Sequence, residues 1–284
     1  MTLLLRPARP DDAQACGRIC YEGFETIGKQ HNFPGAFPSA EVAADVLAGL
    51  IAHPGFYGVV AERDGIVIGS SFMDERSTVS GIGPVTVDPT TQNGGVGKQM
   101  MQHLLDRATS QGTPGVRLLQ AAFHARALTL YAKLGFHVRE GMAIMSGPPL
   151  NLELPGRTVR LATTADLVAC DAVCHAVHGH TRHGELEDSI TSGTALVVEH
   201  GGRVTGYASS LAFFGHAVGE TWDDLKAIIG AVPFIPPPGI LVPLRSPLFH
   251  WGLEHGLRVG VLMNLMSVGL YNEPAGAYLP SVLY

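Results

Sequence analysis

The sequence has few charged residues, few aromatic residues and no long apolar run. Charged residues make up 15% of the chain and hydrophobic residues 46%. This composition is typical of a folded globular protein and excludes a disordered chain. No uncharged apolar stretch approaches the roughly 18 residues that a membrane-spanning helix needs. The opening residues 1–7 are too short and too soon interrupted for a secretory signal, so we expect a cytoplasmic protein with no membrane partner.

Basic residues are also scarce. The chain has 19 Lys and Arg against 25 Asp and Glu, which gives a net charge of −6. Modules that bind nucleic acids usually present a basic face to the phosphate backbone. We therefore expect no nucleic-acid partner.

Cysteine occurs only four times, in two pairs of identical spacing. Cys16 with Cys20 and Cys170 with Cys174 each lie one helical turn apart, so the side chains of each pair share a helix face. Disulfides are rare in the cytosol, and zinc needs four donors at tetrahedral spacing. The histidines near Cys174 match no usual zinc spacing; they are His175, His178, His180 and His183. We expect buried free thiols and no metal.

The cysteine pairs belong to an internal repeat. Arg6, Ala8 and Asp12 precede the first pair as Arg160, Ala162 and Asp166 precede the second, and a second matching block runs over 60–69 and 197–206. A repeat of this length indicates two domains of one fold, and 284 residues suit two domains. The Pro- and Gly-rich segment 147–156 is the predicted joint, which gives domains 1–150 and 151–284.

The first repeat alternates expected strands with helices. Capping and turn signals predict helices over 11–25 and 39–51 and a hairpin around Arg63-Asp64-Gly65. The remaining expected elements are strands at 3–5 and 116–121, a strand ending at Val87, helices from Val96 and over 125–134, and a last strand from Phe136. This order predicts an α/β protein with a mixed sheet.

A glycine-rich loop joins the strand ending at Val87 to the helix that begins at Val96. Gly94, Gly95 and Gly97 fall at the helix start, where backbone amides lack intrahelical partners. Such amides and the positive end of the helix dipole favour a phosphate or pyrophosphate. A tight turn without a ligand is the alternative.

The spacing of the loop excludes two common phosphate motifs. A P-loop needs a glycine five positions before Gly97 and a Ser or Thr after Lys98, but Gln92 and Gln99 stand there. The dinucleotide pattern G-x-G-x-x-G is absent from the loop.

The remaining pattern is Gln92-x-x-Gly95-x-Gly97, which resembles the pyrophosphate loop of the GNAT superfamily of acyl-CoA-dependent N-acyltransferases. The segment Ala127-x-x-Leu130-Tyr131-x-x-Leu134-Gly135-Phe136 resembles the second signature of that family. The resemblance implies two tandem GNAT-like domains, the second of them degenerate.

The resemblance also implies the positions of the site residues. Acetyl-CoA is the expected co-substrate. Its pyrophosphate and pantetheine would contact Val85, Thr86, Val87, Gln92, Asn93, Gly94, Gly95, Val96, Gly97, Lys98 and His124. His124 stands where many members carry an asparagine, and a neutral imidazole can still donate one hydrogen bond. Tyr131 matches the tyrosine that the family uses as general acid, although a core aromatic is the alternative for this position.

The general base stays open between His31, Asp74, Glu75 and a water. For the two carboxylates a solvated turn is the alternative, and a lone loop histidine is more often a bystander. In the second repeat we align Arg245-Ser246-Pro247 with the loop 92–97. That segment has no glycine, and its proline removes a donor amide, so we expect one acyl-CoA site per chain.

These observations predict an N-acetyltransferase. An amine would attack the acetyl-CoA thioester directly in a ternary complex, and the acceptor would be a small-molecule or peptide amine that the sequence does not identify. A non-catalytic acyl-CoA-binding or regulatory module is the alternative. A further alternative places catalysis at the junction of the two domains. Homodimerisation is left open.

Overall fold

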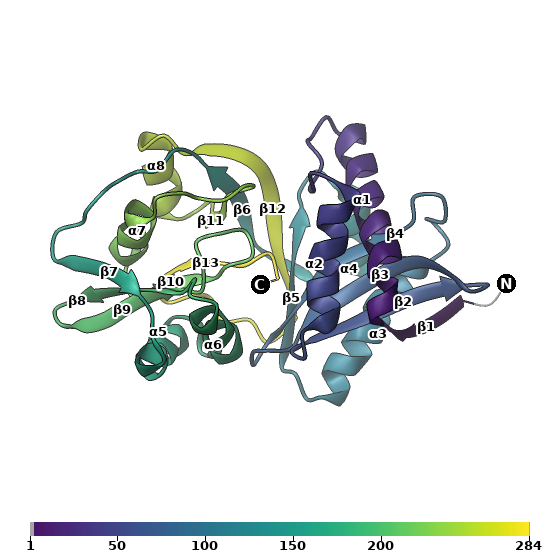
Figure 1. Cartoon of the computed structure of the whole chain (residues 1–284), viewed down its shortest axis with the longest axis horizontal. Helices are drawn as coiled ribbons and strands as arrows, with labels where there is room; N and C mark the ends of the chain where they lie inside the picture. Colours follow the sequence, from purple (N-terminus) through teal and green to yellow (C-terminus); the bar gives the residue numbers. More distant parts are fainter. Residues whose placement is uncertain (1–2, 284) are drawn as a thin grey trace.

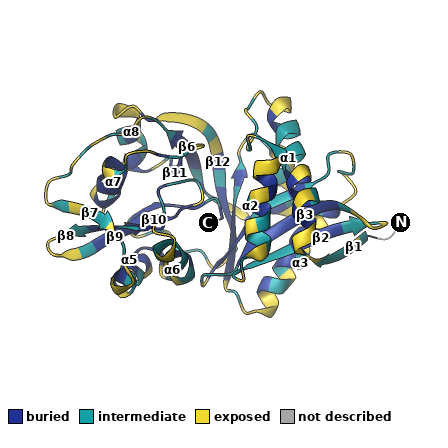
Figure 2. Cartoon of the chain, in the orientation of Figure 1, coloured by how far each residue is buried: buried dark blue, intermediate teal, exposed yellow. Residues whose placement is uncertain are grey.

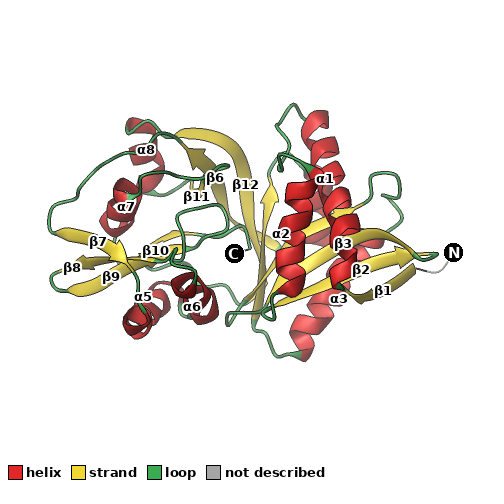
Figure 3. Ribbon diagram, in the orientation of Figure 1, coloured by secondary structure: helices red, strands yellow, loops and turns green. Residues whose placement is uncertain are grey.

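The computed structural model describes residues 3–283, which form two halves side by side (Figure 1). Both halves contain strands with helices packed against them (Figures 1 and 3). The mixed α/β architecture predicted from the sequence is confirmed.

The first half follows the predicted order of elements. Ser39 caps α2 by accepting a hydrogen bond from the Val42 amide at 3.3 Å, and the β2–β3 turn places Asp64 and Gly65 at positive φ (52° and 79°). The elements are β1 (Leu3–Pro7), a short 3₁₀ turn (Pro10–Asp12), α1 (Ala13–Gln30), α2 (Ala40–Ala52), β2 (Phe56–Arg63), β3 (Ile66–Asp74), β4 (Ser80–Val87), α3 (Val96–Ser110), β5 (Gly115–Ala121), α4 (Ala125–Lys133) and β6 (His137–Ser146).

The second half repeats this order of elements. After a 3₁₀ turn at Thr164–Asp166 that corresponds to Pro10–Asp12, helices again alternate with strands. Its elements are β7 (Arg157–Leu161), α5 (Leu167–His178), α6 (His183–Thr191), β8 (Leu196–His200), β9 (Arg203–Ala208), β10 (Ala217–Gly219), α7 (Trp222–Ala231), β11 (Ile240–Pro243), α8 (Pro247–Glu254), β12 (Arg258–Gly269) and an additional strand β13 (Ala277–Leu279).

The central strands of both sheets are largely buried, as Figure 2 shows. Side chains alternate between the faces of a strand. Val60 on β2 therefore packs with Cys16 and Cys20 of α1, whereas its neighbours Val59 and Ala61 pack on the opposite face with α3 and α4. In the second half, Val197 and Val198 divide in the same way between the α5 side and the α7 side.

The residues shared by the two repeats form the same ion-pair cluster in each half. Arg6 contacts Asp12 at 2.7 Å and Glu62 at 2.8 Å. Arg160 contacts Asp166 and Glu199 in the same arrangement, through its Nη2 at 2.7 Å and its Nε at 2.9 Å. Each arginine thus ties the first strand of its half to the second strand and to the turn before the first helix. This cluster accounts for several of the identities in the repeat.

All four cysteines are free and buried, as predicted. Burial raises the pKa of Cys16 to about 11 and that of Cys20 to about 12. The thiols therefore stay protonated at neutral pH and serve as small apolar side chains against the sheet.

The two halves exchange strands. The larger sheet has the order β1-β2-β3-β4-β5-β12-β6-β11, so β12 of the second half lies between β5 and β6 of the first. β6 in turn pairs with β11 of the second half. The sixth strand of each half thus pairs antiparallel with the fifth strand of the other: β6 with β11, and β12 with β5 (Figure 1). The predicted domain boundary at residue 150 stays a prediction. Strand pairing joins residues on either side of this boundary, since β6 pairs with β11 and β5 pairs with β12.

The predicted alignment of Arg245-Ser246-Pro247 with the glycine loop was wrong. Along the chain, β10 and α7 occupy the places of β4 and α3, so the corresponding turn is at residues 219–221. There the Asp224 carboxylate accepts a hydrogen bond from the Thr221 amide at 2.9 Å. A carboxylate already occupies this helix start and would repel a phosphate.

The strand exchange predicts that neither half is stable alone. A fragment of residues 1–150 would leave β6 without both of its sheet neighbours and β5 without the strand that covers its outer edge, and unpaired edges promote aggregation. We expect each fragment to be insoluble when expressed alone and the two to copurify as a 1:1 complex when coexpressed, as measured by size-exclusion chromatography with light scattering. A monomeric 1–150 fragment that unfolds cooperatively would contradict the exchange.

Candidate active site

The central feature of the first half is a gap between β4 and β5. Within the described residues these parallel strands pair only at Ser80 with Val116 and at Gly81 with Arg117. The β3–β4 register shifts between Ser71 and Met73, so β4 carries a bulge just beyond this point. A bulge bends its strand and interrupts pairing. From the bulge onward β4 and β5 diverge, which leaves one edge of β4 without a neighbouring strand.

The free edge of β4 presents backbone groups of Val85 and Val87. The Asp88 amide donates to the Ile68 carbonyl at 2.9 Å, so this residue pair is hydrogen-bonded toward β3. Hydrogen-bonded pairs alternate along an antiparallel ladder. Thr86 therefore also faces β3, whereas the amides of Val85 and Val87 face the gap, where an extended ligand can pair with them.

The glycine loop leads from this edge to an open helix start. Gly95 is the N-cap of α3 with a φ of 77°, and no described side chain caps the helix there. The first helical hydrogen bond runs from the Gln99 amide to the Gly95 carbonyl at 3.1 Å, so the preceding amides have no partner within the helix. A Cβ on Gly95 would meet nothing within 4 Å. The left-handed backbone, and not lack of space, is what favours glycine at this position.

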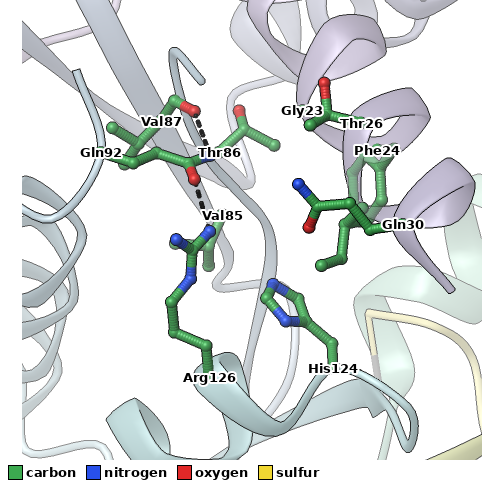
Figure 4. Close-up of a pocket in the computed structure, with 11 residues that line it drawn as sticks. Gly23, Phe24, Thr26, Gln30, Val85, Thr86, Val87, Gln92, His124 and Arg126 are labelled. Atoms are coloured by element: carbon green, nitrogen blue, oxygen red, sulfur yellow. Dashed lines mark hydrogen bonds between the residues drawn. The ribbon is translucent and has the colours of Figure 1, made fainter. Parts of the chain in front are cut away.

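Two connected hollows open along the gap. The larger, of about 270 Å³, lies between the glycine loop and α4. The smaller, of about 100 Å³, lies on the α1 side, where Phe24, Thr26 and Gln30 line it (Figure 4). Five residues line both hollows: Val85, Val87, Gln92, His124 and Arg126. We refer to the two hollows together as the groove.

Of the predicted cofactor-binding residues, all but Gly94 line the groove. Gly94 lies in the same exposed loop, next to Asn93 and Gly95. The structure therefore brings the predicted residues together along one surface. Their contact with a cofactor stays a prediction.

Gln92 bridges the strand and the start of α4. Its Nε2 donates to the Val87 carbonyl at 3.1 Å, and its Oε1 accepts from Arg126 (Figure 4). Arg126 also donates to the Asn93 side chain at 3.3 Å. The guanidinium thus stands beside the glycine loop and makes the site for an anion more positive. Arg126 was not among the predicted site residues; its signal in the sequence is a cation directly before Ala127 of the second signature.

His124 joins β5 to α4 and points into the groove (Figure 4). Burial, and then the positive charge of Arg126 and the neighbouring His31, lower its pKa to about 4. The imidazole is therefore neutral at pH 7 and can donate one hydrogen bond.

Tyr131 lies both in the core and at the groove. It is 9% exposed and packs in the cluster that contains Met100 and Leu104, and it lines the larger hollow. Burial raises the pKa of its phenol to about 12. The phenol therefore keeps its proton at neutral pH.

The three candidate bases lie in different surroundings. The Asp74 carboxylate is buried and accepts from Arg76, with a shortest distance of 2.7 Å, and Glu75 pairs with Arg107 at 2.6 Å. In the described part of the chain, neither carboxylate lines the groove. His31 is exposed, with its ring 5.3 Å from the ring of Phe123, the residue before His124. His31 is near enough to the groove for its charge to lower the pKa of His124, and its role as a base stays a prediction.

The histidines of the second repeat do not converge on one point. His178 Nε2 lies 3.2 Å from His216 Nε2, whereas His183 pairs with Asp171 at 2.6 Å. Among the described residues no group of three or more His, Cys, Asp or Glu is placed to hold a metal ion.

Comparisons with known proteins identify the family. A family model described as "Acetyltransferase (GNAT) domain" matches residues 54–138, which contain β4, the glycine loop and Tyr131. An "IAA acetyltransferase" from Azospirillum brasilense is 30% identical over 105 residues, which cover 36% of this chain and 68% of the relative. The chain belongs to the GNAT acetyltransferase family. It is therefore an acyltransferase, and the fold of this family binds acetyl-CoA.

Solved structures extend the likeness over both halves. A Pyrococcus horikoshii protein described as an acetyltransferase aligns over 97% of this chain and 91% of its own, with a TM-score of 0.71 and 16% identity. A GCN5-related N-acetyltransferase from Sphaerobacter thermophilus aligns over 95% and 96%, with a TM-score of 0.62 and 17% identity. At these identities the likeness shows the fold alone, and that fold includes the second GNAT-like half.

Among the described helices, none combines the length and the apolar character that crossing a bilayer requires.

The position of Arg126 predicts a contribution to cofactor binding. Replacing Arg126 with Gln removes the cation beside the loop, and charge-assisted hydrogen bonds contribute about 1.5–3 kcal/mol. We expect the Kd of CoA to rise at least about tenfold, measured by calorimetry at fixed ionic strength. Lys133→Gln, which removes the same charge at the far end of α4, is the matched control. Equal affinity for both variants would exclude this role for Arg126.

Proposed function

We propose that this GNAT protein is an N-acetyltransferase that transfers the acetyl group of acetyl-CoA to a primary amine, with the groove of the first half as its single active site. The observation that supports this proposal most strongly is the open edge of β4. This edge leads to the uncapped start of α3, and Tyr131 lines the same groove. Each of these features suits one part of the acetyl-CoA molecule.

The groove residues fit acetyl-CoA in sequence along its length. The amides from Gln92 to Gly97 and the guanidinium of Arg126 suit the pyrophosphate. The amides of Val85 and Val87 suit the amide groups of the pantetheine arm, which would continue the sheet as an extended ligand. His124, neutral at pH 7, would supply one further hydrogen bond. Acetyl-CoA itself supplies an activated acyl group on a thiol leaving group.

In the proposed reaction, a neutral amine attacks the thioester carbonyl and forms a tetrahedral oxyanion. A backbone N–H of β4 would stabilise this charge. Collapse of the intermediate forms the amide bond and breaks the carbon–sulfur bond, and the released thiolate then takes a proton from solvent. The amine must lose a proton to a base, for which His31 and a water are the candidates beside the groove.

The environment of Tyr131 limits what it can contribute. Its pKa of about 12 lies above the value of about 8.5 that is typical of a thiol, so complete proton transfer to the thiolate is uphill. A protonated phenol can still donate a hydrogen bond to the developing negative charge. We therefore assign Tyr131 the stabilisation of the leaving thiolate, with an effect at or below the low end of general acid catalysis, about ten- to a hundredfold.

The acceptor class is less defined by the groove. Thr26 and Gln30 line the hollow on the α1 side, and among the described residues no carboxylate lines it. A strongly cationic acceptor would find no counter-charge there. A small-molecule or peptide amine of low charge fits this surface. We also expect the protein to be cytoplasmic.

The experiment that tests the proposal measures thiol release from acetyl-CoA with a panel of small amines, amino acids and peptides. Release that depends on an amine and yields the acetylated product is the expected result. CoA binding without release for any amine would favour the alternative of an acyl-CoA-binding regulatory module.

The role of Tyr131 predicts a selective effect of its hydroxyl. Tyr131→Phe should lower kcat by about ten- to a hundredfold and leave the Kd of acetyl-CoA unchanged, because only the developing thiolate needs the donor. Tyr57→Phe is the matched control, since Tyr57 packs against the same core cluster and its hydroxyl contacts His103 at 2.9 Å, outside the groove. Unchanged kcat in Tyr131→Phe would leave Tyr131 as a core residue only.

A further inference from the structure

We propose that Asn264, on β12 of the second half, is a positioning residue for the groove of the first half, acting through Gln120 on His124. This inference rests on the proposed function, because the groove is assigned there to acyl-CoA. It gives the second half a definite part in that site.

Strand β12 reaches the end of β5 where the groove begins. Met263 of β12 pairs with Ala121, the last residue of β5. One residue further, the Ala122 amide donates to the Leu262 carbonyl at 2.9 Å. The second half therefore holds both the end of β5 and the start of the turn that leads to His124.

Gln120 joins this strand pair to His124. It is 3% exposed, and its Nε2 donates to the His124 carbonyl at 2.9 Å and also to the Ala121 carbonyl. Because both neighbours of the amide nitrogen are acceptors, the amide has one favourable orientation, with Oε1 turned toward β12. There Asn264 Nδ2 donates to Gln120 Oε1 at 2.9 Å.

The hydrogen bond from Asn264 Nδ2 thus fixes the orientation of the Gln120 side-chain amide, which in turn binds the His124 carbonyl. The His124 carbonyl also accepts the Leu128 amide of α4 at 3.1 Å, and the His124 amide donates to Ala121 at 2.8 Å. The turn 121–124 is therefore tied to β5 by Gln120 and to α4 by its own backbone. Without the Asn264 donor, Gln120 Oε1 would be buried with no partner, and the amide would have to turn or move.

Asn264→Leu tests this chain of contacts, because it removes the donor at similar size and adds no charge. We expect the Kd of CoA to rise about tenfold by calorimetry. We also expect the pKa of His124, followed by NMR and assigned with His124→Gln, to move from about 4 toward the ordinary value near 6.5 as the imidazole becomes more hydrated.

Ser267→Ala is the matched control. Ser267 lies on the same strand and accepts a hydrogen bond from Arg139 at 2.8 Å, so its loss removes a comparable contact that does not lead to the groove. It should leave both the Kd of CoA and the pKa of His124 unchanged. Loss of stability alone would appear in the Tm and would not move the His124 titration.

Two further measurements keep the inference testable. If Asn264→Leu does not fold, Asn264→Asp, which sets an acceptor against Gln120 Oε1, must weaken CoA binding in its place. In a Gln120→Met background, Asn264→Leu should change the Kd of CoA by less than about a third of its effect in the wild-type chain, because Gln120 no longer links Asn264 to His124. Equal effects in both backgrounds would overturn the inference.

The same measurements separate a missing role of Asn264 from a missing acyl-CoA site. If the wild-type chain transfers acetyl groups but Asn264→Leu leaves CoA affinity and the His124 titration unchanged, Asn264 has no positioning role. If the wild-type chain does not bind CoA, the proposed function fails, and the His124 titration still decides whether Asn264 positions the turn.

Discussion

The site depends on the divergence of two neighbouring strands. β4 and β5 pair at their first residues only, within the described chain, and then separate beyond a bulge in β4. β4 stays paired with β3 and β5 with β12, whereas beyond Gly81 the described residues of β4 and β5 do not pair with each other. The backbone groups of Val85 and Val87, the open start of α3 and the phenol of Tyr131 are arranged around this gap.

The second half maintains that gap. β12 pairs with β5 from Gly115 to Ala121 and separates it from β6, which pairs onward with β11. A half that lacks the glycine loop thus supplies the strand that pairs with β5 of the half that contains the groove. Its own helix start at α7 already carries the Asp224 carboxylate. The chain therefore has two copies of one fold that differ in what they contribute. The first copy forms the groove, and the second supplies the strand β12 that pairs with β5.

Local signals in the sequence predicted most of the elements, and the resemblance to the family supplied the predicted cofactor-binding residues, most of which line the groove. Ser39, the Asp64-Gly65 turn and the glycine loop act through their own backbone, and local chemistry can be read from local sequence. The strand exchange and the contact of Asn264 with Gln120 could not be predicted this way, because they join residues far apart in the chain. The second-half loop was misaligned because β10 has only three residues, all buried, and shows no alternating pattern.

The central claim is one acyl-CoA site per chain, at the gap between β4 and β5. Calorimetric titration of the full-length protein with CoA tests it most directly, combined with a crystal structure of the complex. The account predicts one CoA per chain, with its pyrophosphate at the start of α3 and its pantetheine arm along Val85–Val87. Two CoA molecules per chain, or a CoA bound at the start of α7, would contradict it.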